Sequence, residues 1–242
     1  MNTKTRSLKI SDIQVEIVRK DIKNLHLAVY PPYGRVRVAA PELLNDEAIR
    51  LAVITRLAWI KRQQAVYTNQ VRQSEREMVT GESHYVGGRR YLLDVIEEEA
   101  PPSVRIRNNR TLELKVRPGT GRDKREKILN DWYRKLLREQ LADLVPKWKA
   151  RTGVEVAEYR IKKMKTRWGT CNIQARRIWL NLELAKKSSA CLEYILVHEM
   201  IHLLERHHND QFWKYLNRFL PQWQLTRDEL NRSPLGHEDW RY

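Results

Sequence analysis

The stretch Val197-His198-Glu199-Met200-Ile201-His202-Leu203 decides how the second half of this chain is organised. His198 and His202 are four residues apart, so on a helix their side chains lie one above the other on the same face. Two imidazoles in that arrangement can bind one zinc ion, and Glu199 can take a proton from a water molecule beside it. The flanking apolar residues are Leu192, Ile195, Leu196, Ile201, Leu203 and Leu204. The spacing therefore predicts a metal-binding helix in the core. The alternative interpretation is two core histidines bonded to backbone carbonyls.

A catalytic zinc site needs a third protein ligand. His208 is six residues after His202, and on one continuous helix it would point about 240° away and lie about 9 Å further along. We therefore expect the helix to end near residue 204 or 205, and Asn209 or Asp210 to cap a following helix. His208 is the candidate third ligand. The rival ligands are His207, Glu229 and Glu238.

The composition is that of a globular protein with an excess of positive charge. The chain has 242 residues, 41% of them hydrophobic and 31% charged, and its formal net charge is +16. No run approaches the ~18 apolar residues of a membrane span, and the start has no apolar leader block. Cys171 and Cys191 form neither a C-x-x-C motif nor a disulfide framework. We therefore expect a cytoplasmic protein without a membrane partner, and we leave its oligomeric state open.

The positive charge is concentrated just before the predicted metal helix. Nine lysines and arginines lie between residues 160 and 187, against one acid, Glu183. A basic surface near a catalytic site favours an anionic substrate or association with nucleic acid. The alternative is an ordinary solvated surface.

Hydrophobic periodicity predicts an α+β fold. The first part is β-rich with one helix over residues 46–72. Its expected strands are residues 9–18, 25–29, 35–38, 84–86, 90–96, 104–107 and 111–116. A helix over 123–151, in which Pro146 would introduce a kink or an end, and strands at 154–164 and 177–182 precede the metal helix. Residues 117–121 are the expected boundary, which gives regions 1–120 and 121–242. No internal repeat is evident.

Three sequence blocks in order resemble the YgjP-like family of zinc metallopeptidases, within the zincin group that also holds the SprT and WLM-type proteases. These blocks are Tyr159 to Cys171 with Arg167-Trp168-Gly169, Ile178 to Leu182, and His198 to Trp213. The resemblance implies a zincin-like core: a long helix, a small antiparallel sheet, the H-E-x-x-H helix and C-terminal helices. It also implies Zn²⁺ ligands at His198, His202 and His208, with Glu199 as general base.

The resemblance has departures and leaves the substrate open. His207 stands where members often have Asn, and Ser188-Ser189 where a Pro usually precedes the helix. Members are described as peptidases from their motif, while hydrolysis of a nucleoside triphosphate, UTP, has also been attributed to the family. We therefore expect a peptide, protein or nucleotide substrate.

Several residues in these blocks have two interpretations. Arg167 is a candidate substrate ligand for a carboxylate or phosphate, and Asn181 either binds substrate backbone or turns the chain. Trp168 and Gly169 are interpreted as core and turn residues, and Cys171 as a free thiol or a fourth ligand.

The sequence supports three functions in order. The first is a zinc metallopeptidase. The second is a nucleoside triphosphate pyrophosphohydrolase whose basic residues hold the phosphates. The third is a nucleic-acid-associated accessory protein with a structural zinc.

Overall fold

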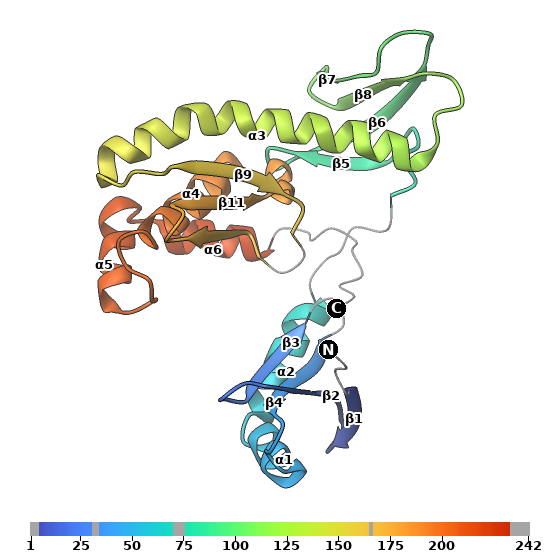
Figure 1. Cartoon of the computed structure of the whole chain (residues 1–242). Helices are drawn as coiled ribbons and strands as arrows, with labels where there is room; N and C mark the ends of the chain where they lie inside the picture. Colours follow the sequence, from blue (N-terminus) through green and yellow to red (C-terminus); the bar gives the residue numbers. More distant parts are fainter. Residues whose placement is uncertain (1–4, 31–33, 70–75, 165–166, 233–242) are drawn as a thin grey trace. The chain divides into compact units, whose positions relative to one another are not determined.

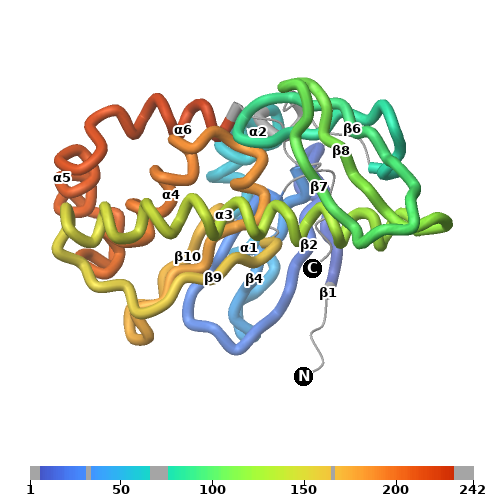
Figure 2. The backbone as a smooth tube through the Cα atoms, turned by 90° about the horizontal axis from the view of Figure 1, so that it is seen from above, coloured from blue at the N-terminus to red at the C-terminus, as the bar shows by residue number. Residues whose placement is uncertain are grey.

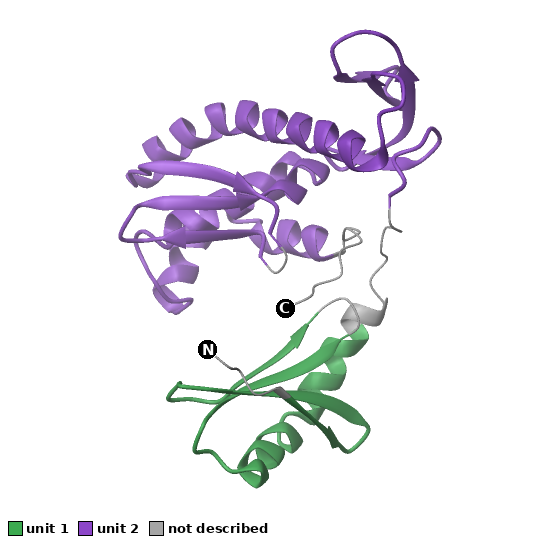
Figure 3. Ribbon diagram, turned by 45° about the vertical axis from the view of Figure 1, so that its right-hand side comes forward, with its two compact units in different colours: residues 1–72, 237–242 green, residues 73–236 purple. Residues whose placement is uncertain are grey.

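The structure is a computed structural model that describes residues 5–30, 34–69, 76–164 and 167–232. It is an α+β fold, as the sequence predicted, and its small sheets are mixed. The chain divides into two compact units, one of residues 1–72 with 237–242 and the other of residues 73–236 (Figure 3). Each unit is described here by itself.

The first unit is a four-stranded sheet with two helices (Figure 1). Its strand order is β1-β2-β4-β3, in which β2 and β4 are parallel and the outer pairs are antiparallel. The elements are β1 Thr5–Ile10, β2 Ile13–Lys20, β3 His26–Tyr30, β4 Arg35–Pro41, α1 Asp46–Ile54 and α2 Leu57–Asn69. A core of its own joins the sheet to both helices, through Val15, Ile17, Val36, Val38, Ile49, Val53 and Ile60.

Two predictions for this unit are wrong in detail. The single strand expected over residues 9–18 is a hairpin, because Ser11 adopts a positive φ of 57° and turns the chain between β1 and β2. The single helix expected over 46–72 is two helices. The Thr55 hydroxyl donates to the Ala52 carbonyl at 3.1 Å, and Thr55 follows two further β-branched residues, which weakens the helix at the point where it breaks. The hairpin expected from residues 25–29 and 35–38 is confirmed.

The second unit begins with another four-stranded sheet, of order β5-β6-β8-β7. Its central strands β6 and β8 are parallel and its outer pairs are antiparallel, so its topology repeats that of the first sheet. The strands are β5 Ser83–Val86, β6 Arg89–Glu97, β7 Ser103–Arg107 and β8 Thr111–Val116, close to the predicted bounds. The repeat was not evident from the sequence.

A long helix, α3, follows this sheet and extends along the second unit to the region of α5 (Figure 2). It runs from Arg122 to Thr152, and Pro146 lies inside it without ending it. Its buried residues recur every three or four positions, so one face is apolar: Leu129, Tyr133, Leu137, Leu141, Val145 and Trp148. The Tyr133 hydroxyl donates to the Tyr85 carbonyl at 2.8 Å, which ties α3 to β5.

A three-stranded sheet and three further α-helices complete the second unit. The elements are β9 Glu158–Lys162, β10 Gly169–Asn172, β11 Arg177–Asn181, the 3-10 helix η1 Leu182–Lys186, α4 Ser189–Ile201, α5 Asp210–Phe219 and α6 Trp223–Arg232. The sheet order is β10-β11-β9, with β9 parallel and β10 antiparallel to β11. The sequence predicted a purely antiparallel sheet and missed β10, which is short and only half-buried.

The division between the units lies at residue 72, whereas the sequence placed a boundary at residue 120. The reason is packing. Leu112, Leu114 and Val116 of β8 belong to the same hydrophobic cluster as α3 and α4, so the second sheet joins the C-terminal core. In the described part of the chain, no helix is both long and apolar enough to span a membrane.

Candidate metal centre

The helix α4 carries the H-E-x-x-H motif at its C-terminal end. The Ser188 side chain accepts from the Cys191 amide and caps the helix start, and α4 is apolar on nearly all sides because it lies in the core. It ends at Ile201. Beyond this end, the amides of Leu204 and Glu205 both donate to the Ile201 carbonyl at 2.8 Å. The helix therefore stops close to where the sequence predicted.

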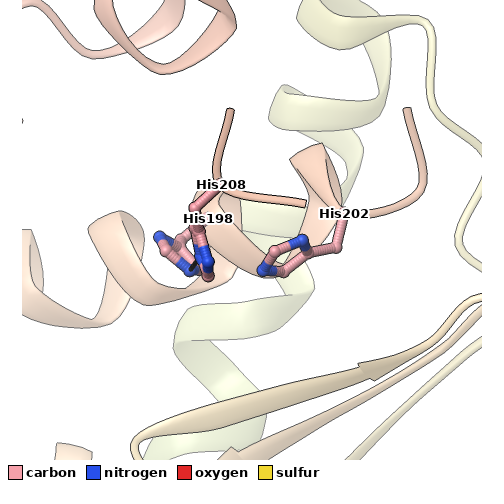
Figure 4. A group of neighbouring side chains, drawn as sticks. All are labelled: His198, His202 and His208. Atoms are coloured by element: carbon pink, nitrogen blue, oxygen red, sulfur yellow. Dashed lines mark hydrogen bonds between the residues drawn. The ribbon is translucent and has the colours of Figure 1, made fainter. Parts of the chain in front are cut away.

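The chain then reverses and brings His208 back to the helix. Asn209 caps α5 by accepting from the Phe212 amide at 3.0 Å, which confirms one of the two predicted caps. His208 Nε2 lies 3.0 Å from His198 Nε2. One ligand nitrogen from each of His198, His202 and His208 lies within 4.8 Å of the others (Figure 4). In the described residues these three side chains form the only such group of potential metal ligands.

The protonation states favour metal binding. Burial, with the nearby His202 and His208, lowers the pKa of His198 to about 3, so this ring is neutral at pH 7. Burial also lowers the pKa of His202. His202 Nδ1 lies 3.2 Å from the Glu205 carbonyl, which can only accept a hydrogen bond, so the proton is on Nδ1 and Nε2 has a free lone pair.

The donor set fits zinc. Three neutral imidazoles are a common ligand set for Zn²⁺ and leave a fourth position open. The two Nε2 atoms of His198 and His208 face one another at hydrogen-bond distance, and His198 Nδ1 is buried with no hydrogen-bond partner in the described chain. A cation shared by the Nε2 lone pairs would leave the ring proton of His198 on Nδ1.

Glu199 is buried beside this group, with 6% of its surface exposed. Burial raises its pKa to about 8, and the positive charge of Arg167 opposes that rise. A Cβ atom on Gly169 would lie 2.7 Å from Glu199 Cγ and from Oε1. The glycine therefore lets β10 pass directly against the carboxylate, which is a role the sequence did not suggest.

Aromatic side chains from α5 and α6 support the three imidazoles. The Phe212 ring centroid lies 4.9, 4.8 and 4.6 Å from those of His198, His202 and His208. Trp213 stacks on His208 at 5.7 Å, and Trp223 stacks on Trp213 at 5.0 Å. Hydrophobic periodicity does not predict these contacts, because stacking between helices depends on tertiary structure.

The rival ligands lie elsewhere or are not described. His207 is exposed and outside the group, and Glu229 is within electrostatic reach of Cys191 near the start of α4. Glu238 lies outside the described residues. Cys171 is half-buried near Glu199, and burial raises its pKa to about 11, so it is a protonated thiol at pH 7. It does not belong to the ligand group.

Asn181 is buried and its side chain is fully used by the chain itself. Its Nδ2 donates to the carbonyls of Met164 and Arg167, both at 2.8 Å. Its Oδ1 accepts from the amides of Met164 and Glu183, both at 3.2 Å. Of the two predicted interpretations, this geometry favours the structural one, because no donor or acceptor remains for a substrate.

Several of the basic residues before the helix are paired with acids or buried. Lys163 pairs with Glu126, Lys186 with Glu183, and both Arg160 and Arg177 with Glu158. Lys187 is buried above the Trp168 ring, and burial lowers its pKa to about 8. Arg167 differs from these residues, because it is exposed and its guanidinium makes no hydrogen bond or ion pair with the described chain.

Comparison with protein families finds a match over most of the chain. A family model described as "YgjP-like, metallopeptidase domain" matches residues 23–233. A solved structure, the metallopeptidase zymogen of Pyrococcus abyssi abylysin, is 22% identical and has a TM-score of 0.35; the match covers 39% of this chain and 99% of that one. No curated protein sequence matches the chain.

Proposed function

The chain belongs to the YgjP-like metallopeptidase domain family, and on that premise we propose that it is a zinc-dependent hydrolase that cleaves peptide bonds. The observation that carries this proposal is the convergence of three imidazole side chains beside one buried carboxylate. His198, His202 and His208 would hold the zinc ion, and Glu199 would act as the general base.

The chain's own residues define what each group would do. Bound zinc supplies a Lewis acid that polarises a carbonyl and acidifies water. Glu199 would accept the proton of the attacking water at a carboxylate oxygen and pass it to the leaving amine. Its carboxylate is held against Gly169, and a nearby cation lowers the pKa of a buried acid, so Glu199 would be ionised for this step. Phe212, which touches all three imidazoles, would keep water away from their rear.

Hydrolysis of nucleoside triphosphates is the second candidate. Arg167 is the observation in its favour, because an exposed arginine without an ion-pair partner in the described chain could bind a phosphate. Most of the other basic residues between 160 and 187 are already paired or buried, which reduces the support for a phosphate clamp. We therefore rank peptide hydrolysis above hydrolysis of nucleoside triphosphates. No contact in the described chain favours the nucleic-acid accessory role.

The test compares hydrolysis by the zinc-loaded wild-type protein with hydrolysis by Glu199→Gln on one panel of substrates. The panel contains denatured proteins, proteins bound to DNA, and the four nucleoside triphosphates. Glutamine has the shape of glutamate but cannot accept the proton, so we expect zinc content and circular dichroism to be kept while peptide cleavage falls about 10²- to 10⁴-fold. Cleavage products are read by mass spectrometry, and pyrophosphate or phosphate release by a coupled assay.

Glu193→Gln is the matched control on the same helix. Glu193 lies on α4 and bonds to Lys147 and Trp148, so this variant removes a carboxylate without touching the metal group. It should cleave like wild type. Peptide cleavage that survives Glu199→Gln would remove Glu199 from the mechanism, and Glu199-dependent release of phosphate or pyrophosphate without peptide cleavage would replace the peptidase by the second candidate.

A further inference from the structure

We infer that Arg167 recognises a carboxylate of the peptide substrate next to the scissile bond, so that the enzyme prefers acidic peptides. This inference rests on the proposed peptidase function and adds the chemical class of its substrate. It is argued from the way the chain holds Arg167 and from what surrounds its side chain.

The backbone is anchored at Arg167 and at the residue that follows it. Asn181 Nδ2 donates to the Arg167 carbonyl at 2.8 Å, and the Asn181 amide donates to the next carbonyl, that of Trp168, also at 2.8 Å. The Trp168 ring lies 5.5 Å from the ammonium group of Lys187. Asn181 is 4% exposed and Lys187 is 6% exposed, so both anchors belong to the core. The backbone that carries the Arg167 side chain is therefore held in place.

The guanidinium group of Arg167 is available to bind a ligand. The residue is exposed, and its guanidinium has neither an ion pair nor a hydrogen bond with the described chain. In this it differs from the paired cations Lys163, Lys186, Arg160 and Arg177. An arginine that the fold holds in place but leaves without an acid is suited to a planar, bidentate anion such as a carboxylate.

The position of Arg167 links it to the reaction. Two residues later in the chain, Gly169 lies directly against the Glu199 carboxylate. Arg167 is also close enough for its charge to act on Glu199. A carboxylate bound by Arg167 would therefore lie close to the peptide bond whose hydrolysis Glu199 assists. Because Glu199 is itself an acid, Arg167 would also offset its repulsion of an anionic substrate.

The test is a cleavage-specificity profile of the full-length, zinc-loaded protein. Denatured proteins are digested, and the residues around each cut are read by mass spectrometry for wild type, Arg167→Gln, Arg167→Lys and Arg167→Glu. We expect wild type to favour Asp or Glu at one position near the cut. Arg167→Lys should keep part of this preference, Arg167→Gln should lose it, and Arg167→Glu should favour Lys or Arg at that position.

Paired peptides then measure the size of the effect. A peptide with Asp at the preferred position is compared with its Asn counterpart, each with a free and with an amidated C-terminus. Loss of one charge-assisted contact should raise KM for the acidic peptide about 10- to 100-fold in Arg167→Gln, with kcat and zinc content little changed. A dependence on the free C-terminus instead of the Asp side chain would identify the terminal carboxylate as the recognised group, which also supports the inference.

Two other arginines serve as controls. Arg138→Gln removes the same charge from the exposed side of α3 and should leave the profile unchanged. Arg206 lies in the turn between His202 and His208, so Arg206→Gln tests the other exposed arginine near the imidazoles. If Arg206→Gln, and not Arg167→Gln, abolishes the acidic preference, the inference is wrong.

The cleavage results also distinguish failure of this inference from failure of the proposed function. Glu199-dependent cleavage without an Arg167-dependent preference for either a side-chain or a terminal carboxylate overturns the inference and leaves the peptidase in place. If wild type cleaves no peptide and instead hydrolyses nucleoside triphosphates in an Arg167-dependent way, both are overturned, because the anion at Arg167 is then a phosphate.

Discussion

The two four-stranded sheets of this protein have the same topology but different partners. In each, a central parallel pair is flanked by antiparallel strands, with the order β1-β2-β4-β3 in the first and β5-β6-β8-β7 in the second. The first is followed by two short helices, α1 of 9 residues and α2 of 13, and the second by the 31-residue α3. The length of the helix after each sheet determines which core that sheet belongs to.

The first sheet closes a core of its own, and the second shares its core with the metal centre. Ile49, Val53 and Ile60 of the short helices pack into a cluster that, among the described residues, is separate from the core of the second unit. Helix α3, in contrast, bonds to β5 through Tyr133 and to α4 through Trp148, whose Nε1 donates to Glu193 at 2.8 Å. One sheet topology therefore serves as an independent unit in one place and as a support for the site helix in the other.

The largest expected effect is on fragments cut at the two alternative boundaries. A fragment of residues 73–236 keeps the second sheet with α3, so it should fold, unfold cooperatively in urea and bind one zinc ion. A fragment of residues 121–242 loses seven buried side chains of this core, those of Met78, Val86, Tyr91, Leu93, Leu112, Leu114 and Val116. Each contributes about 1.5–3 kcal/mol, and together they rival the ~5–15 kcal/mol stability of a whole domain. This fragment should therefore be unfolded.

Circular dichroism and zinc titration of both fragments check this prediction, with full-length protein as the reference. A folded, zinc-binding 121–242 fragment would show that the second sheet is dispensable. The contrast between the sheets would then disappear, and the boundary at residue 120 that the sequence suggested would be restored.

Sequence patterns predicted the second unit better than the first. The strands between residues 84 and 116 and the helix from 123 to 151 match the structure closely, because turns at Gly87-Gly88 and Asn108-Asn109 separate them and their periodicity is long. The hairpin at Ser11 was missed because no glycine or proline marks it. The boundary was missed because burial of β8 against α3 is a long-range contact, which periodicity does not report.

For the candidate site, the sequence predicted which histidines would meet. The spacing from His202 to His208 requires a chain reversal, and the structure contains one. What the sequence could not predict depends on tertiary contacts. The approach of Gly169 to Glu199, the hydrogen bonds of Asn181 to the chain before β10, and the stacking of Trp213 on His208 all join segments distant in the chain or on different elements.

The next effect in size concerns the aromatic support of the third imidazole. Trp213 stacks on His208 with an interplanar angle of 28°, and His208 is exposed, with Phe212 as a second aromatic neighbour. Trp213→Ala should therefore weaken zinc binding about 10- to 100-fold, as loss of supporting contacts around metal ligands does elsewhere. Trp213→Phe should recover much of the affinity. Competition with a chelating dye measures both.

Trp59 is the matched control in the first unit. It is a tryptophan with 37% of its surface exposed, so Trp59→Ala removes a similar ring where no metal group is present. Its zinc affinity should equal that of wild type. Equal affinity of Trp213→Ala and wild type would instead mean that His208 needs no stacking partner, and that the turn alone fixes it.

The smallest expected effect is a difference between the two sheets in how their stability depends on pH. His84 on β5 is 4% exposed, and burial keeps its pKa below the ordinary 6.5, although Glu82 at 3.2 Å opposes this and the charges of Arg76 and Lys186 add to it. The unfolded chain therefore binds this proton more readily than the folded chain. Stability from His84 is fully present above pH 6.5 and is lost as the pH falls towards the folded-state pKa, by at most about 1.4 kcal/mol per pH unit.

The measurement is urea unfolding of the zinc-free protein between pH 7 and pH 5, for wild type, His84→Gln and His26→Gln. His198 and His202 also destabilise the folded chain on acidification, so the readout is the difference in slope between each variant and wild type. His84→Gln should flatten the pH dependence of the second unit. His26 is exposed on β3 of the first sheet, so His26→Gln should leave both units unchanged. An unaltered slope in His84→Gln would mean that the second sheet opens before His84 is protonated, and that it supports the metal centre less firmly than its shared core implies.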